Sequence, residues 1–508
     1  MNESSYRYRN ILRSTSIMGG AQVISILASI GKMKFAAVLL GPAGVGLFGI
    51  YTNLFQTAAA IASLGISNVG TRQVAAANAN SSELGVARTR RALFWGALAL
   101  ASAGGLIFWL LSGWIARVVL SDSSLTNDVR WLALGVTLTV AAGSQIALLT
   151  GLHRVTDLAR INIGAGVIGG LLGVLALWLW PRQGLIVMTL ITPLVAVLIG
   201  LIFVLRLGRP TGSHTPVHQM AEEWRAMVRL GLPFMASSLV TMLGQLAIRT
   251  LVQRGLGTNA LGQFQAAWTI GMTYLGVIVG AMATDYYPRL TAAIRERAVA
   301  VKLINEQTEV ALLLCAPALL GMLGLTPWVM RVLYSPEFEP ASEVLRWQLL
   351  GDIPKVLSFP LAFVLLASGA GKTYLATEIF GMGILVIGVF IGLPILGVKS
   401  TGVAFLATYL LYLPLVWWLA RRRIGFRWTP TVRIQALAVV AAAVAVDIAA
   451  RWSDPLGAGL GVGLAVLFGI GALSRLSAVV GAGGRLGRLA AIGEKAKFKL
   501  ARRKMNRD

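Results

Sequence analysis

The sequence has little charge, few potential metal ligands and a single cysteine. Charged residues make up 13% of its 508 residues, whereas soluble domains carry about 25%. With Cys315 alone, no internal disulfide can form, and the three histidines fall in connections between apolar runs. This composition excludes water-soluble enzymes and predicts no metal site.

Nucleotide-binding motifs are also missing. The stretch "SGAGKTY" (368–374) resembles a phosphate loop, but such a loop requires a glycine where this chain has Leu366. No alternation of strands and helices surrounds the stretch, so we interpret it as a connection between two helices. The sequence predicts no catalytic residue and no cofactor, and a gradient of H⁺ or Na⁺ is the expected energy source.

Long apolar runs dominate the chain instead. Hydrophobic residues make up 56% of it and the mean hydropathy is +0.74, and runs of 18 or more apolar residues are typical of transmembrane helices. The sequence predicts an all-α polytopic membrane protein with fourteen spans, or twelve if the last two, which are short and rich in Gly and Ala, do not cross. The expected spans are residues 14–40, 45–70, 92–116, 131–152, 161–180, 184–205, 230–253, 261–288, 304–330, 346–368, 374–396, 400–420, 434–450 and 456–473.

The basic residues predict the orientation of these spans. Of the 45 Lys and Arg residues, 33 fall in the segments that are cytoplasmic if the N-terminus is, and 8 fall in the opposite ones. By the positive-inside rule, both termini are expected in the cytoplasm. The net charge of +25 therefore reflects membrane topology, and no nucleic-acid partner is expected. The basic tail after residue 474 is either a solvated segment or a contact for anionic phospholipid.

Four basic residues lie inside apolar runs, namely Lys32, Lys34, Arg249 and Lys355. A lysine at the bilayer centre costs roughly 2.5–3.5 kcal/mol, so such charges face protein or water-filled cavities. They are the first candidates for binding residues.

The two halves of the chain echo each other. A shift of 216 residues places "GPAGVGLF" (41–48) on "GTNALGQF" (257–264). Both halves enter the membrane in the same direction, which predicts a parallel repeat of two six-helix lobes around a central cavity. The expected domains are an N-lobe (1–205), a cytoplasmic linker (206–229), a C-lobe (230–420), a basic connection with the last two helices (421–473) and a basic cytoplasmic tail (474–508).

Each half also carries a polar stripe that ends in a cation. Gln22, Ser25, Ser29 and Lys32 lie within about an 80° arc of one helix. Ser238, Thr241 and Gln245 precede Arg249 on a similar arc of the other. Buried Ser and Gln also form hydrogen bonds between helices, so that interpretation stays open for them. Because neither cation has an acidic residue within one turn, we predict that both line a cationic cavity.

Two further groups leave alternatives open. Lys34 lies about 200° around its helix from Lys32, so it faces the cavity or extends its amine outward. Asp352 and Lys355 stand at i and i+3 on one helix, as a structural ion pair or as an ion-coupling site. Glu378 and Asp285 are the other candidate coupling carboxylates.

The head of the chain (residues 16–76) resembles the Wzx-type polysaccharide flippases. These are the O-antigen translocases of the multidrug/oligosaccharidyl-lipid/polysaccharide exporter superfamily. The most specific pieces are "LLGPAGVGLFGIY" (39–51) and "SLGISNVGTRQVA" (63–75), and Arg72 matches the arginine of the second. The resemblance covers about residues 10–420.

The resemblance implies two six-helix bundles around a central cationic cavity. Its implied cargo is an undecaprenyl-pyrophosphate-linked oligosaccharide, which crosses from the cytoplasmic to the periplasmic leaflet of the bacterial inner membrane without ATP hydrolysis. A polysaccharide polymerase and a chain-length regulator are its expected partners. The two additional C-terminal spans look more like those of the fourteen-span flippases of lipid-linked peptidoglycan precursors.

Two other functions compete with this interpretation. A multidrug/ion antiporter of the same superfamily would be favoured by acidic residues in the cavity, whereas the surplus here is basic. A polytopic glycan polymerase or ligase would need a long external loop for its catalytic residues. The external connections of this chain are short; residues 331–345 are among the longest.

Overall fold

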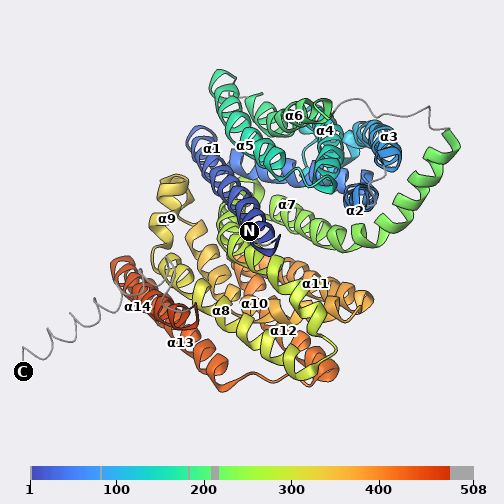
Figure 1. Cartoon of the computed structure of the whole chain (residues 1–508). Coiled ribbons are helices and arrows are strands. Elements are labelled where there is room, and N and C mark those ends of the chain that lie inside the picture. The colour runs from blue at the N-terminus through green and yellow to red at the C-terminus, as the bar shows by residue number, and fades with distance from the viewer. Residues whose placement is uncertain (1–2, 80–82, 181–182, 208–216, 481–508) are drawn as a thin grey trace, which may run out of the picture. The chain divides into compact units, whose positions relative to one another are not determined.

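The computed structural model describes residues 3–79, 83–180, 183–207 and 217–480, and all regular elements in this part of the chain are helices (Figure 1). They are α1 (Glu3–Ala62), α2 (Ile66–Ala79), α3 (Glu83–Ile115), α4 (Thr126–Gly151), α5 (Val155–Leu179), α6 (Gly184–Leu205), α7 (Val217–Ala293), α8 (Arg297–Gly324), α9 (Thr326–Leu333), α10 (Ala341–Ala367), α11 (Gly371–Leu396), α12 (Lys399–Ile424), α13 (Pro430–Trp452) and α14 (Asp454–Val480). The predicted all-α fold class is confirmed. Most of the predicted basic tail and the middle of the predicted linker lie outside the described residues.

The number of membrane crossings depends on how two long helices are counted. Among the described residues, 11 helices are long and apolar enough to cross a membrane, or 12 with a bent pair on α7. One of them, Gly19–Ala62, has 44 residues and is about 66 Å long, twice the thickness of a bilayer core. The prediction of fourteen spans counts this segment and Ser238–Gly280 as two spans each, and that count stays a prediction.

Both long helices are interrupted at a glycine. Gly41 in α1 has φ 62° and ψ −166°, and Gly257 in α7 has φ 80° and ψ −179°. These conformations are open to glycine and strained for other residues. The two glycines are 216 residues apart, so the backbone has the same break at the positions that the sequence repeat aligns.

Two compact units divide the chain. The first comprises residues 1–265 and 333–338, and the second comprises residues 266–332 and 339–508. The first unit thus includes α7 up to Gln265, together with a short segment between α9 and α10. The lobe boundaries predicted from the sequence stay a prediction.

Within the first unit, two helices meet at a pair of glycines. A Cβ atom added at Gly46 would lie 2.7 Å from the carbonyl oxygen of Thr258 and 2.7 Å from the nitrogen of Gly262. A Cβ atom added at Gly262 would in turn overlap the carbonyl group of Pro42. Each residue touches the one 216 positions away or that residue's neighbourhood, so the crossing is symmetric between the two halves. We call this contact the glycine crossing.

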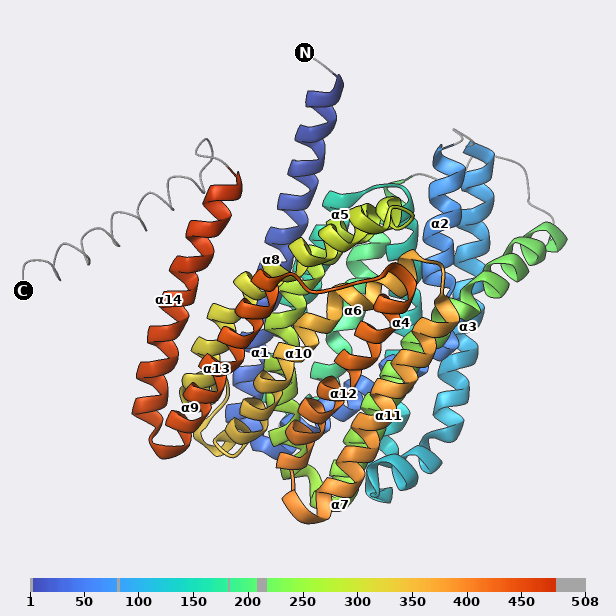
Figure 2. The same ribbon diagram turned by 90° about the horizontal axis from the view of Figure 1, so that it is seen from below.

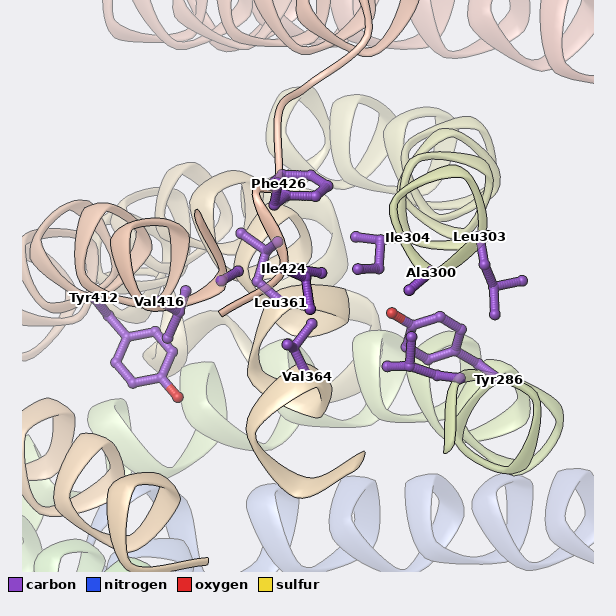
Figure 3. Packing of buried hydrophobic residues seen from close by; sticks show 12 residues of the cluster. Tyr286, Ala300, Leu303, Ile304, Leu361, Val364, Tyr412, Val416, Ile424 and Phe426 are labelled. Carbon is purple, nitrogen blue, oxygen red and sulfur yellow. The ribbon is translucent and has the colours of Figure 1, made fainter. Parts of the chain in front are cut away.

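Within the second unit, α10 packs along α12, α8 along α14, and α13 beside α14 (Figure 2). Close packing of α8 on α14 occurs at glycines, where a Cβ atom at Gly461 would lie 2.8 Å from the Cα atom of Gly324. A hydrophobic core joins α7, α8, α10 and α12, as Figure 3 shows. Its Tyr286 hydroxyl donates to the carbonyl of Pro360 at 2.9 Å, where proline has removed the helical donor.

The glycine crossing generates a stability prediction. Gly262→Ala places a methyl group against the Pro42 carbonyl, and overpacking of this kind costs about 1–3 kcal/mol. The purified variant should therefore melt at a lower temperature in detergent. Gly383→Ala is the matched control, because nothing lies within 4 Å of a Cβ atom there and alanine favours helix. Equal melting temperatures for Gly262→Ala and the wild type would show that the crossing is not tightly packed.

Candidate functional site

Lys32 lies in the first unit, on α1 before the Gly41 break. Its Nζ donates to Thr192 Oγ1 on α6 at 3.4 Å and lies 5.1 Å from the ring centroid of Phe48. No acidic side chain within ion-pair distance of this amine occurs in the part of the chain that the structure describes. The charge is therefore stabilised by a hydroxyl dipole and by the negative face of an aromatic ring.

Arg249 has a similar environment on α7, in the same unit. Its side chain is 4% exposed, and its guanidinium carbon lies 5.7 Å from the ring centroid of Phe264. Its Nε donates to Gln265 Oε1 and its Nη1 donates to the carbonyl of Gln245, both at 3.1 Å. Among the described residues, only these neutral acceptors bind the guanidinium.

The two cations are related by the repeat. Phe48 and Phe264 are 216 residues apart, so each cation rests on the equivalent ring of its own half. Each ring is two residues, about 3 Å along the helix, from a glycine of the glycine crossing. The crossing therefore places both cation–ring pairs close to the same point of the first unit. Two buried cations without a carboxylate partner form a ready site for an anion.

Sequence reasoning identified the cations but missed their supports. Thr192 and Gln265 gave no signal, because each lies far in sequence from the residue it binds or outside the aligned motif. Phe48 and Phe264 did give one, since each is the last residue of the aligned pieces "GPAGVGLF" and "GTNALGQF".

The predicted polar stripes are only partly buried. Ser25 donates through its hydroxyl to the carbonyl of Asn162 on α5 at 3.1 Å, which is the helix–helix bond left open by the sequence. Thr241 and Gln245 are half-buried. The remaining three, Gln22, Ser29 and Ser238, are exposed.

Lys34 and Arg72 lie apart from the two buried cations. The Lys34 amine donates to the carbonyl of Tyr334, in the segment before α10 that belongs to the first unit. Arg72 is exposed on α2. The structure thus gives Lys34 a protein partner and brings neither residue onto the Phe48 or Phe264 rings.

A second buried cluster lies in the second unit, around Asp352 of α10. The expected pair with Lys355 is present, with Nζ 3.8 Å from Asp352 Oδ1, and Tyr274 of α7 donates its hydroxyl to Oδ2 at 2.6 Å. Asp352 is 0% exposed, as is Gln348 one turn before it. Neither amide atom of Gln348 and no donor for Asp352 Oδ1 is satisfied by a hydrogen bond within the described residues. This cluster is a polar, charge-compensated region in an apolar surrounding.

Lys355 is held mostly by soft contacts. Its Nζ lies 5.0 Å from the ring centroid of Phe405 and 5.4 Å from that of Tyr409, both on α12. It also lies 3.5 Å from the sulfur of Met272. Ser358, predicted on the same side of the helix, donates to the Lys355 carbonyl at 2.8 Å.

The other candidate carboxylates differ in burial. Glu378 on α11 is half-buried and accepts from the Tyr412 hydroxyl at 3.2 Å. Asp285 is 73% exposed and pairs with Arg289 at 2.9 Å, so it lacks the burial that made it a candidate. No group of three or more His, Cys, Asp or Glu side chains suited to a metal ion occurs among the residues that the structure describes.

Comparison with known proteins identifies two families. The family described as "Polysaccharide biosynthesis protein" matches residues 11–293, and the family described as "Lipid II flippase MurJ" matches residues 160–465. The "Lipid III flippase" of Escherichia coli (strain K12) is 25% identical over 421 residues, which are 79% of this chain and 96% of that protein. A protein of the same name from Shigella flexneri matches equally well.

Solved structures share the fold. The inward closed conformation of "Lipid II flippase MurJ" matches with a TM-score of 0.71 at 10% identity, over 92% of this chain and 99% of that one. An inward-facing MATE family transporter of the MOP superfamily matches with a TM-score of 0.63 at 17% identity, over 80% of this chain and 94% of that one. The predicted superfamily is confirmed. The chain belongs to the polysaccharide biosynthesis protein family and to the lipid II flippase MurJ family, whose matches overlap at residues 160–293.

Proposed function

We propose that this chain is a flippase for lipid-linked oligosaccharide. Its cargo would be an undecaprenyl-pyrophosphate-linked oligosaccharide, moved from the cytoplasmic to the periplasmic leaflet of the bacterial inner membrane for surface polysaccharide assembly. Family membership and the "Lipid III flippase" relative support a transporter of lipid-linked cargo over a multidrug antiporter or a glycan polymerase.

One observation carries this proposal: the two buried cations of the first unit, Lys32 and Arg249, have only neutral partners among the described residues. A pyrophosphate has two anionic groups linked by one oxygen, and each of the two cations could bind one of them. Fixed cations act strongly on such a group because the local dielectric constant is low. The lipid tail would remain in the bilayer while the headgroup crosses.

The Asp352 cluster fits a different task. Its carboxylate already has Lys355 and Tyr274 as partners, so it is suited to titration or to cation exchange more than to phosphate binding. We propose Asp352 as the principal coupling carboxylate for a gradient of H⁺ or Na⁺, with Glu378 as the second candidate. A direct contact of Lys355 with the cargo stays a prediction.

The remaining elements of the proposal follow from the charge distribution and the family. Both termini would lie in the cytoplasm, where the positive-inside rule places the basic segments. Transport would proceed by alternating access. Anionic phospholipid at the basic tail, and a polysaccharide polymerase and a chain-length regulator downstream, are the proposed partners.

The two cations should be needed for flipping. Lys32→Ala and Arg249→Ala each remove a charge-assisted hydrogen bond of about 1.5–3 kcal/mol, which corresponds to roughly ten- to hundredfold weaker cargo binding. Lys32→Arg should keep part of the activity, and Lys32→Glu should be worse than Lys32→Ala. The measurement is translocation of native cargo in proteoliposomes, with membrane abundance checked for each variant.

Lys302→Ala is the control for this series, because Lys302 is exposed and pairs only with Glu306, at 3.9 Å. Normal transport by both alanine variants at normal abundance would refute the phosphate role of the two cations.

Asp352 should decide whether a gradient drives transport. Asp352→Asn keeps an acceptor for Tyr274 but removes the charge, so gradient-driven flipping should fall by about tenfold or more. Asp285→Asn should transport normally, since Asp285 is exposed and already paired. The assay is flipping in ion-tight vesicles with and without an imposed H⁺ or Na⁺ gradient. A requirement for ATP, or unchanged gradient dependence in Asp352→Asn, would disprove the coupling role.

A further inference from the structure

An open groove runs between α3 and α4 in the first unit, on helices that pack side by side (Figure 1). Its volume is about 700 Å³, within the range of roughly 300–1,000 Å³ that small-molecule sites occupy. It is lined by Gly105, Leu106, Trp109, Asn127, Arg130, Trp131, Ala133, Leu134 and Thr137. None of the residues named above for cargo or coupling contributes to it.

A glycine forms the floor of the groove. A Cβ atom at Gly105 would overlap the Thr137 hydroxyl, so the two helices approach each other closely at this level. Trp109 on α3 and Trp131 on α4 stand beside the approach and are 47% and 53% exposed. Two large aromatic walls on either side of a narrow contact leave the groove open between them.

One end of the groove is polar and positively charged. Asn127 and Arg130 are one turn apart near the start of α4, and both are exposed. Within the described residues, the Arg130 guanidinium has the Trp109 ring as its partner, at 5.5 Å, and no acceptor for its N–H groups. The Asn127 amide also has no hydrogen-bond partner there. None of the lining residues is acidic.

The other end of the groove is apolar. Thr137 lies seven residues beyond Arg130, about 10 Å along α4, and its hydroxyl is already bonded to the Ala133 carbonyl at 3.1 Å. Leu106 and Leu134 line the space between, 59% and 48% exposed. Because α3 ends at Ile115 and α4 begins at Thr126, the charged end is near the helix ends and the apolar end lies deeper along the spans.

We infer that this groove binds an anionic phospholipid of the surrounding bilayer. The phosphodiester would accept from Arg130 and Asn127 at the helix ends, and one acyl chain would lie along Leu106 and Leu134. Arginine at the membrane surface binds phosphate through several N–H groups, and tryptophan is enriched at that level. A single cation matches the single negative charge of a phosphodiester, whereas a diphosphate would require more positive charge than the groove has.

Lipid binding to the purified protein tests this inference without reference to transport. Native mass spectrometry would compare phosphatidylglycerol, which is anionic, with phosphatidylcholine, which is zwitterionic. The wild type should bind phosphatidylglycerol more tightly, and Arg130→Ala should weaken that binding by about tenfold. Arg130→Lys should retain part of it. Leu134→Trp, which fills the groove, should weaken binding even though the charge is kept.

Arg117→Ala is the matched control, because Arg117 is exposed near the same helix end but lies outside the groove and bonds to the Gly113 carbonyl. It should bind phosphatidylglycerol like the wild type. Unchanged binding in both Arg130→Ala and Leu134→Trp would overturn the inference. Displacement of phosphatidylglycerol from the groove by undecaprenyl diphosphate at equal concentration would overturn it too, by assigning the groove to the cargo lipid.

Discussion

The close approach of Gly46 and Gly262 is the contact on which the proposed site depends. No side chain separates the two helices at this point, so the residues that follow on each helix are fixed relative to the other half. Phe48 and Phe264 are the first aromatic residues after the crossing. A methyl group at either glycine would push the helices apart and move both rings. The symmetry of the contact explains why each half contributes one cation over the same kind of ring.

The two units treat buried charge in opposite ways. In the first, Lys32 and Arg249 are supported by aromatic faces and neutral oxygens, which lower the cost of burial without neutralising the charge. In the second, Asp352 and Lys355 compensate each other and Tyr274 fixes the carboxylate. An anionic headgroup therefore finds unmatched positive charge in the first unit, whereas the second unit holds a pair whose balance a single cation would change.

Much of this could be predicted from the sequence because it is local. Apolar runs define helix positions, positive φ favours glycine at positions 41 and 257, and the i, i+3 spacing joins Asp352 to Lys355. The partners from distant segments could not be predicted. Thr192 reaches Lys32 across 160 residues and Tyr274 reaches Asp352 across 78, and helical periodicity says nothing about which faces meet. Lys34 illustrates the limit, since its partner is a backbone carbonyl 300 residues away.

Binding of the headgroup itself tests most directly whether Lys32 and Arg249 act together on one diphosphate. The purified wild type and the Lys32→Ala, Arg249→Ala and double variants would be titrated with undecaprenyl diphosphate and undecaprenyl monophosphate. The account predicts a clear preference of the wild type for the diphosphate, and a loss in the double variant that departs from the sum of the single losses, as coupled residues show. Equal affinity for the two lipids, or strictly additive losses, would contradict it.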